Sequence, residues 1–139
     1  MTVYFDTSVL VSLFIRDDNT AAAFRLGAAS PDAVTSTWAV AEFSSALGLR
    51  VRTGRLTSDE RGRAEGLLDA WLESNSAPVA PLAQDFLDAR AFVRRVDAAL
   101  RAPDALHLAI CRRIGADLGS LDEVMGRAGE ELAISVRRA

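Results

Sequence analysis

Short apolar segments alternate along the chain with longer segments in which apolar residues recur every three or four positions. The short segments predict strands and the longer ones predict helices. Strands are expected at residues 2–5, 33–36, 78–81, 116–120 and 132–136, and helices at 9–14, 20–29, 38–52, 57–74, 83–100 and 103–114, with a short helix after residue 122. Because no two strands are close enough for a hairpin, helical crossovers between parallel strands are expected. The sequence therefore predicts an α/β fold, a three-layer sandwich with a short, mostly parallel sheet flanked by helices.

Residues with helix-capping preferences support several of these boundaries. Thr7 or Ser8 suits the N-cap of the first helix. Residues 57–60 read Thr-Ser-Asp-Glu, a pattern similar to a capping box. Pro103 is tolerated in the first turn of a helix, and Gly115 suits the end of the same helix.

The size and composition of the chain are those of one domain with a real core. It has 139 residues, of which 50% are hydrophobic. No stretch approaches the ~18–20 consecutive apolar residues of a membrane span, and the N-terminus lacks the pattern of a secretory signal. The one cysteine, Cys111, cannot form an internal disulfide. Residues 1–139 are therefore expected to form a single cytoplasmic domain without membrane association.

The charge balance excludes some function classes. Sixteen basic and nineteen acidic residues give a net charge of −3, which by itself argues against nucleic-acid binding. All sixteen basic residues are arginines. The chain therefore lacks the lysine that a lysine nucleophile, a P-loop or a receiver domain requires.

Four acidic residues occupy positions that the predicted sheet would bring together. Asp6 ends the first strand, Asp122 follows the fourth strand, and Asp104 lies in the first turn of the helix before that strand. Sites of open parallel sheets form at the carboxyl ends of the strands. Glu42 lies on a helix face beside Trp38 and small residues, where a carboxylate is costly unless a cation or donor pairs with it.

Each acid alone also has a structural interpretation. Asp6 could close a turn, Asp104 could favour the helix dipole, and Asp122 could be an N-cap. Together, however, carboxylates within ~5 Å of one another would repel by roughly a few kcal/mol per pair. A hard divalent cation removes that repulsion, and oxygen ligands suit Mg²⁺ or Mn²⁺. The joint pattern favours a metal site.

Four segments of the chain resemble the PIN-domain family, and within it the VapC-type toxins of bacterial toxin–antitoxin pairs. They are Tyr4–Ser8, Trp38–Glu42, Pro103–Ala109 and Ser120–Asp122. The run Asp-Ala-Leu-His-Leu-Ala in the third segment is the most specific part. The chain departs from the family at Ser120, where threonine is frequent, and at Gly119, where an apolar strand residue is usual.

The resemblance implies a PIN-like fold and a metal-dependent endoribonuclease that hydrolyses RNA phosphodiester bonds as the toxin of such a pair. Asp6, Glu42, Asp104 and Asp122 would be the catalytic residues and the ligands of Mg²⁺ or Mn²⁺, with Asp6 and Asp104 as the main ligands. The expected partners are an RNA substrate, a cognate antitoxin protein and a second copy of the chain in a homodimer.

Two other functions are open. The first is a catalytically silent RNA- or protein-binding module on the same fold. The second is a phospho-acceptor or phosphatase domain that uses Asp6, although phosphatases of the haloacid-dehalogenase type need a second Asp where Ser8 stands.

Several conspicuous residues are better assigned to structure than to chemistry. His107, Cys111 and the two tryptophans are expected in packing. Each arginine cluster is expected on a solvated helix face, with RNA contact as the alternative. The clusters are Arg50 with Arg52 and Arg55, Arg94 with Arg95, and Arg112 with Arg113.

Overall fold

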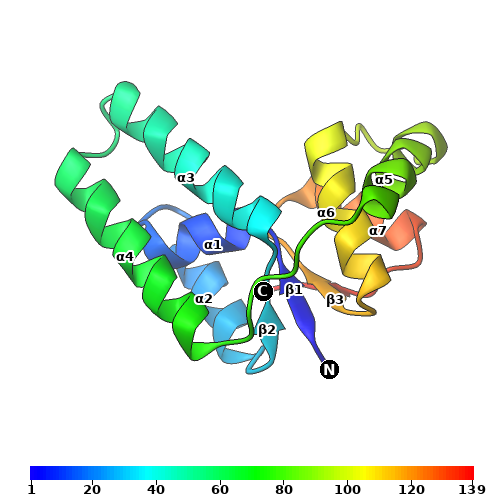
Figure 1. Cartoon of the computed structure of the whole chain (residues 1–139), viewed down its shortest axis with the longest axis horizontal. Coiled ribbons are helices and arrows are strands. Elements are labelled where there is room, and N and C mark those ends of the chain that lie inside the picture. Colours follow the sequence, from blue (N-terminus) through cyan, green and yellow to red (C-terminus); the bar gives the residue numbers. More distant parts are fainter.

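The computed structural model describes Met1–Ala139 and consists of a small central sheet between two groups of helices (Figure 1). The strands are β1 (Val3–Phe5), β2 (Ala33–Val34), β3 (Asp117–Gly119) and β4 (Val136–Arg137). The helices are α1 (Thr7–Phe14), α2 (Thr20–Ala28), α3 (Thr37–Arg52), α4 (Ser58–Ser74), α5 (Ala83–Arg95), α6 (Ala102–Arg113) and α7 (Glu123–Glu131). The predicted α/β fold is confirmed. None of the helices is both long and apolar enough to span a bilayer.

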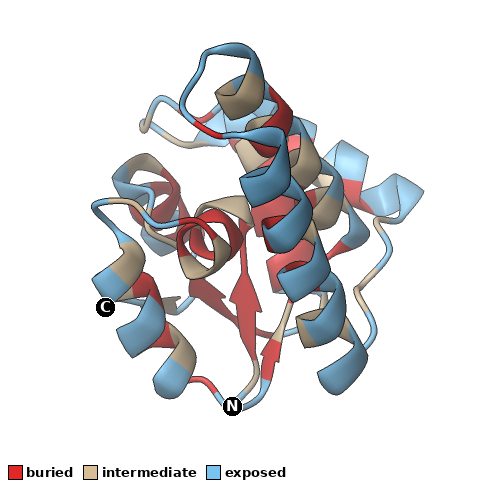
Figure 2. Cartoon of the chain, turned by 90° about the vertical axis from the view of Figure 1, so that its left-hand side faces the viewer, coloured by how far each residue is buried: buried red, intermediate tan, exposed pale blue.

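The sheet is parallel throughout, with the strand order β2-β1-β3-β4. In the register, Val3 of β1 lies opposite Ala33 on one side and Asp117 on the other. All residues of β1 and β3 are buried, so the strands appear as the inner layer in Figure 2. Buried on both faces, β1 is a continuous apolar run, whereas β3 carries Asp117, which pairs with Arg137.

Side chains of β1 alternate between two separate cores, because successive strand residues point to opposite faces of the sheet. Val3 and Phe5 pack against the group formed by α1–α4. Tyr4 packs against the group formed by α5–α7. The two groups flank the sheet in Figure 1. The end of β1 is therefore where residues from both halves of the chain meet.

Two of the predicted segments differ in the structure. Residues 78–81 form no strand, and only an isolated bridge joins Val79 to Ser36. Prolines on both sides of this segment cannot donate to a ladder, which limits pairing. The helix predicted for 83–100 ends at Arg95, because the backbone amides of Asp97 and Ala98 donate to the carboxylate of Glu131 instead of continuing the helix.

Two boundaries also differ. The N-cap of α1 is Asp6 rather than Thr7 or Ser8, since the Asp6 carboxylate accepts from the amide of Val9. The last strand begins at Val136 rather than at residue 132, because α7 continues to Glu131 and is followed by a turn. The expected capping box of α4 at Thr57 is confirmed.

Gly119 makes room for the side chains of Phe5 and Val3 on the neighbouring strand β1. A Cβ at this position would lie 2.8 Å from Cδ1 of Phe5 and 3.0 Å from Cγ1 of Val3. Real Cβ atoms almost never come this close to another atom, so a side chain here would displace those two side chains. The departure from an apolar residue here is explained by packing, and it does not interrupt the strand.

Candidate active site

The four predicted acids lie near the carboxyl edge of the sheet, two of them directly after strands and two of them on helices. Asp6 and Asp122 follow β1 and β3 and cap the helices that come next, α1 and α7. The backbone amide of Asp6 also donates to the carbonyl of Gly119 at 3.2 Å, which ties the two strand ends together. Asp104 lies in the first turn of α6, and Glu42 lies in the second turn of α3. The N-cap interpretation of Asp122 is therefore correct, and Asp6 has the same role.

Asp6 is a buried carboxylate held by hydroxyl groups. It is only 2% exposed, and its oxygens accept from Ser8 Oγ at 2.6 Å and from Ser120 Oγ at 2.5 Å. Burial raises the pKa of Asp6, although the nearby His107 and the two hydroxyls act in the opposite direction. No arginine lies within ion-pair distance of it.

Glu42 is held by a chain of hydrogen bonds that runs from its partly buried carboxylate into the core. Its Oε1 accepts from Thr7 Oγ1 at 2.7 Å and from Nε2 of His107. The other ring nitrogen, Nδ1, lies 2.7 Å from the hydroxyl of Tyr4, which in turn lies 2.7 Å from Ser36 Oγ. Burial alone would raise the pKa of Glu42, but the bonds from His107 and Thr7 outweigh it and hold that pKa below its usual value.

His107 and Tyr4 are positioning residues that the sequence analysis missed. His107 is 1% exposed, which agrees with the packing role expected for it, but its ring also fixes the orientation of Glu42. Burial raises the pKa of the Tyr4 phenol, so the hydroxyl keeps its proton. One signal was available: a tyrosine in a fully buried strand needs a hydrogen-bond partner.

Asp104 and Asp122 complete the group without any cationic partner. Asp104 is half-buried and Asp122 is exposed, and neither forms an ion pair. Burial raises the pKa of Asp104, and so do the negative charges of Asp122, Glu42 and Asp6, whereas His107 acts in the opposite direction. The other three carboxylates therefore lie within electrostatic reach of Asp104.

The donor chemistry of this group fits a hard divalent cation. All four side chains offer oxygen ligands, and negative charge is concentrated there without an arginine to balance it. The side chains do not converge in the structure: no three carboxylate, imidazole or thiol groups are arranged to hold one ion. The fit thus rests on donor type and charge.

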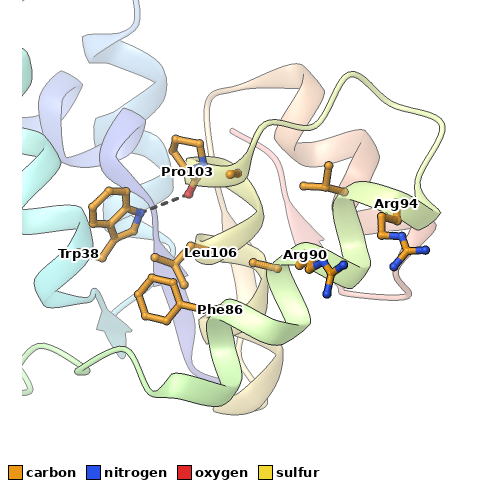
Figure 3. Close-up of a pocket in the computed structure, with 9 residues that line it drawn as sticks. Trp38, Phe86, Arg90, Arg94, Pro103 and Leu106 are labelled. Atoms are coloured by element: carbon orange, nitrogen blue, oxygen red, sulfur yellow. Dashed lines mark hydrogen bonds between the residues drawn. The ribbon is translucent and has the colours of Figure 1, made fainter.

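Two hollows flank the acids. One is an open, mostly apolar groove of about 500 Å³ between α5, the start of α6 and Trp38 of α3. Figure 3 shows Phe86 and Leu106 lying beside Trp38, whose indole N–H donates to the carbonyl of Pro103 at 3.2 Å. The other is a polar cavity of about 320 Å³ on the α1 side of the acids.

The chain is similar to one known protein family and to several solved structures. A family profile described as the PIN domain matches residues 3–131. No curated protein matches the chain. Among solved structures, VapC20 from Mycobacterium tuberculosis, a sarcin–ricin loop cleaving toxin, is 22% identical with a TM-score of 0.73, and the match covers 99% of each chain.

Two further structures share the fold at lower identity. FitAcB from Neisseria gonorrhoeae is 17% identical with a TM-score of 0.61, over 96% of this chain and 95% of that one. VapBC2 from Rickettsia felis, bound to a DNA fragment from its promoter, is 13% identical with a TM-score of 0.65, over 99% of this chain and 98% of that one.

Proposed function

Because the chain belongs to the PIN-domain family, we propose that it is a metal-dependent endoribonuclease that acts as the toxin of a toxin–antitoxin pair. The observation that carries the proposal is the group of four carboxylates at one edge of the sheet, none of them paired with an arginine. Clusters of uncompensated charge in a fold are typical of functional sites.

The proposed ligands of Mg²⁺ or Mn²⁺ are Asp6 and Asp104, with Glu42 and Asp122 completing the shell directly or through water. A bound divalent ion would supply an acidified water and would neutralise charge on a phosphodiester. The residues around the ligands orient them. Ser8 and Ser120 hold Asp6, and the hydrogen bond from His107 holds Glu42.

Single-stranded or loop RNA is the proposed substrate, because its backbone and bases are accessible. The structural neighbour VapC20, a sarcin–ricin loop cleaving toxin, supports this choice. The test is incubation of purified protein with structured RNA, with and without EDTA, beside a D104N variant purified identically. Cleavage should require the metal and the intact Asp104, and cleavage that survives chelation would contradict the metal mechanism.

An antitoxin is the proposed protein partner. The resemblance to VapC-type toxins supports it, and the unpaired acids offer a place for an arginine or lysine of the antitoxin's tail. Such a residue would take the position of the cation. Reversing the charge of the tail should weaken the complex, and an unaffected complex would exclude this mode of inhibition.

A homodimer is proposed through the apolar groove of Figure 3. Of the eight large hydrophobic residues that are exposed, four lie between residues 82 and 93, on or beside α5. Phe86 is 56% exposed, so F86E should shift the protein to monomer in light scattering at micromolar concentration. Leu67 on α4 is equally exposed, and L67E is the matched control that should leave the dimer intact.

The alternative function is a catalytically silent RNA- or protein-binding module. The retained carboxylates favour the enzyme, since a binding module has no use for four neighbouring acids without an arginine partner. Titration calorimetry with Mn²⁺ separates the two, because only the metal-dependent enzyme should bind the ion.

A further inference from the structure

The polar cavity on the α1 side of the acids is continuous with the candidate active site. Thr7, Ser8 and Asp122 line it from the side of the acids, and the first two also hydrogen-bond Glu42 and Asp6. Arg50 and Asp17 line its far side. A molecule bound at the carboxylates can therefore extend into this cavity.

Arg50 is the one basic residue among those lining the cavity. It lies on α3 eight residues after Glu42, and Ala46, which also lines the cavity, lies midway between them. Residues four apart share a helix face, and eight residues correspond to about 12 Å along the axis. The helix thus carries Glu42 and Arg50 on the same side, separated by two turns.

The guanidinium of Arg50 is only loosely held. Its nearest acidic atom is Asp17 Oδ2 at 3.8 Å, the same oxygen that accepts a hydrogen bond from Ser12 Oγ at 3.0 Å. An arginine offers five N–H donors in a planar fork. A single long ion pair leaves most of these donors available to another anion, and the side chain is 30% exposed.

The other arginines at this end of α3 do not share the position. Arg52 and Arg55 are exposed and do not line the cavity. The cluster of three arginines noted in the sequence therefore divides into one residue that faces the candidate active site and two that face solvent.

We propose that Arg50 binds a phosphate of the RNA that flanks the scissile phosphodiester, so that the polar cavity is a subsite for the neighbouring nucleotide. The inference rests on the proposed ribonuclease function. A phosphate matches the fork of the guanidinium, and bidentate binding of this kind fixes the strand relative to the carboxylates. Arg50 would hold the strand and take no part in the chemistry at the metal, because it lies about two helical turns from Glu42.

The test measures binding of a labelled single-stranded oligoribonucleotide by fluorescence anisotropy as a function of salt. D104N serves as the background so that the RNA is not cut. Adding R50A should weaken binding about tenfold and lower the slope of log affinity against log salt by about 0.7, the value for one phosphate contact on a single strand. Adding R50K should keep most of the slope, because the charge remains.

Two controls separate a phosphate contact from a structural role. R55A removes an exposed arginine three residues beyond the end of α3 and should leave both affinity and slope unchanged. D17N breaks the ion pair but keeps the cation, so it should bind at least as tightly as the background. An R50A effect reproduced by D17N would overturn the proposal, and so would an R50A protein that binds like R55A.

Failure of the proposed ribonuclease function would give different results from failure of the role of Arg50 alone. If the wild-type protein neither binds nor cuts RNA, the ribonuclease proposal fails and the subsite fails with it. If the wild-type protein binds and cuts RNA but R50A leaves the salt slope intact, only the role of Arg50 is wrong.

Discussion

Asp85 and Asp104 lie in the first turns of the neighbouring helices α5 and α6, yet their surroundings are opposite. Asp85 accepts two hydrogen bonds from Arg113, at 2.8 and 2.9 Å, and one from the amide of Leu82. Burial alone would raise the pKa of Asp85, but these partners hold it below its usual value. Asp104 has no such partner, and both burial and three neighbouring acids raise its pKa.

The same contrast holds at the sheet. Asp117 in β3 pairs with Arg137 of β4 at 2.7 Å, whereas Asp6 at the end of β1 is held by hydroxyl groups. Four of the sixteen arginines form ion pairs with acids elsewhere in the chain, and none of them pairs with an acid of the candidate site. Unbalanced carboxylates reduce the stability of the fold, and their concentration at one edge is best explained by function.

The largest loss of stability is expected when Asp85, whose charge is balanced by Arg113, is removed. D85A leaves the amide of Leu82 without its acceptor and leaves Arg113 with only the carbonyl of Ala80. Because the Arg113 side chain is partly exposed, the loss is expected to be about 2 kcal/mol of unfolding free energy. Urea titration measures the loss. D69N removes an exposed acid on α4 and should change the unfolding free energy by less than about 0.5 kcal/mol.

A smaller effect on the unfolding free energy is expected at Asp6, which is held by hydroxyl groups and not by a cation. S120A removes one of the two hydroxyl donors to Asp6 and should cost about 1 kcal/mol of unfolding free energy. S120T keeps the hydroxyl and should be close to wild type, and S45A on an exposed part of α3 is the neutral control. Equal stabilities for S120A and S45A would show that Asp6 does not depend on this donor.

The smallest effect is the change with pH in the difference between the unfolding free energies of wild type and D85A. The folded pKa of Asp85 is lower than its ordinary value of 3.8, so the unfolded chain takes up the proton first as the pH falls. The stability from the pair is therefore fully present above about pH 4 and is lost as the pH falls toward the folded pKa. Urea titrations should show the two proteins converging in acid, and a constant gap would mean that the charge of Asp85 is unimportant.

Much of the fold could be predicted from the sequence because its signals are local. Buried parallel strands are short apolar runs, and helices show apolar spacing and caps such as that at Thr57. The segment at 78–81 is predicted to be a strand, but prolines at both of its ends limit it to a single bridge between Val79 and Ser36. The end of α5 could not be predicted either, because it depends on Glu131, more than thirty residues away.

The four acids could be predicted as a group because topology decides where strand ends meet. Their partners could not, since the contacts between Tyr4 and His107 and between Glu42 and His107 join distant parts of the chain. Nor does a pattern of apolar residues reveal which of three arginines turns toward the site. That distinction depends on the face of α3 on which Arg50 lies.

The central proposal is that the negative charges of the four carboxylates repel one another until a metal ion binds and neutralises them. The most direct measurement is thermal melting of wild type and D104N, both stripped with EDTA, before and after addition of Mn²⁺. Removing one of the repelling charges should let metal-free D104N melt at or above the temperature of metal-free wild type. Mn²⁺ at a hundred times its dissociation constant should stabilise wild type by about 2.7 kcal/mol, and D104N much less. A metal-free D104N that melts below wild type and gains as much from Mn²⁺ would contradict the claim.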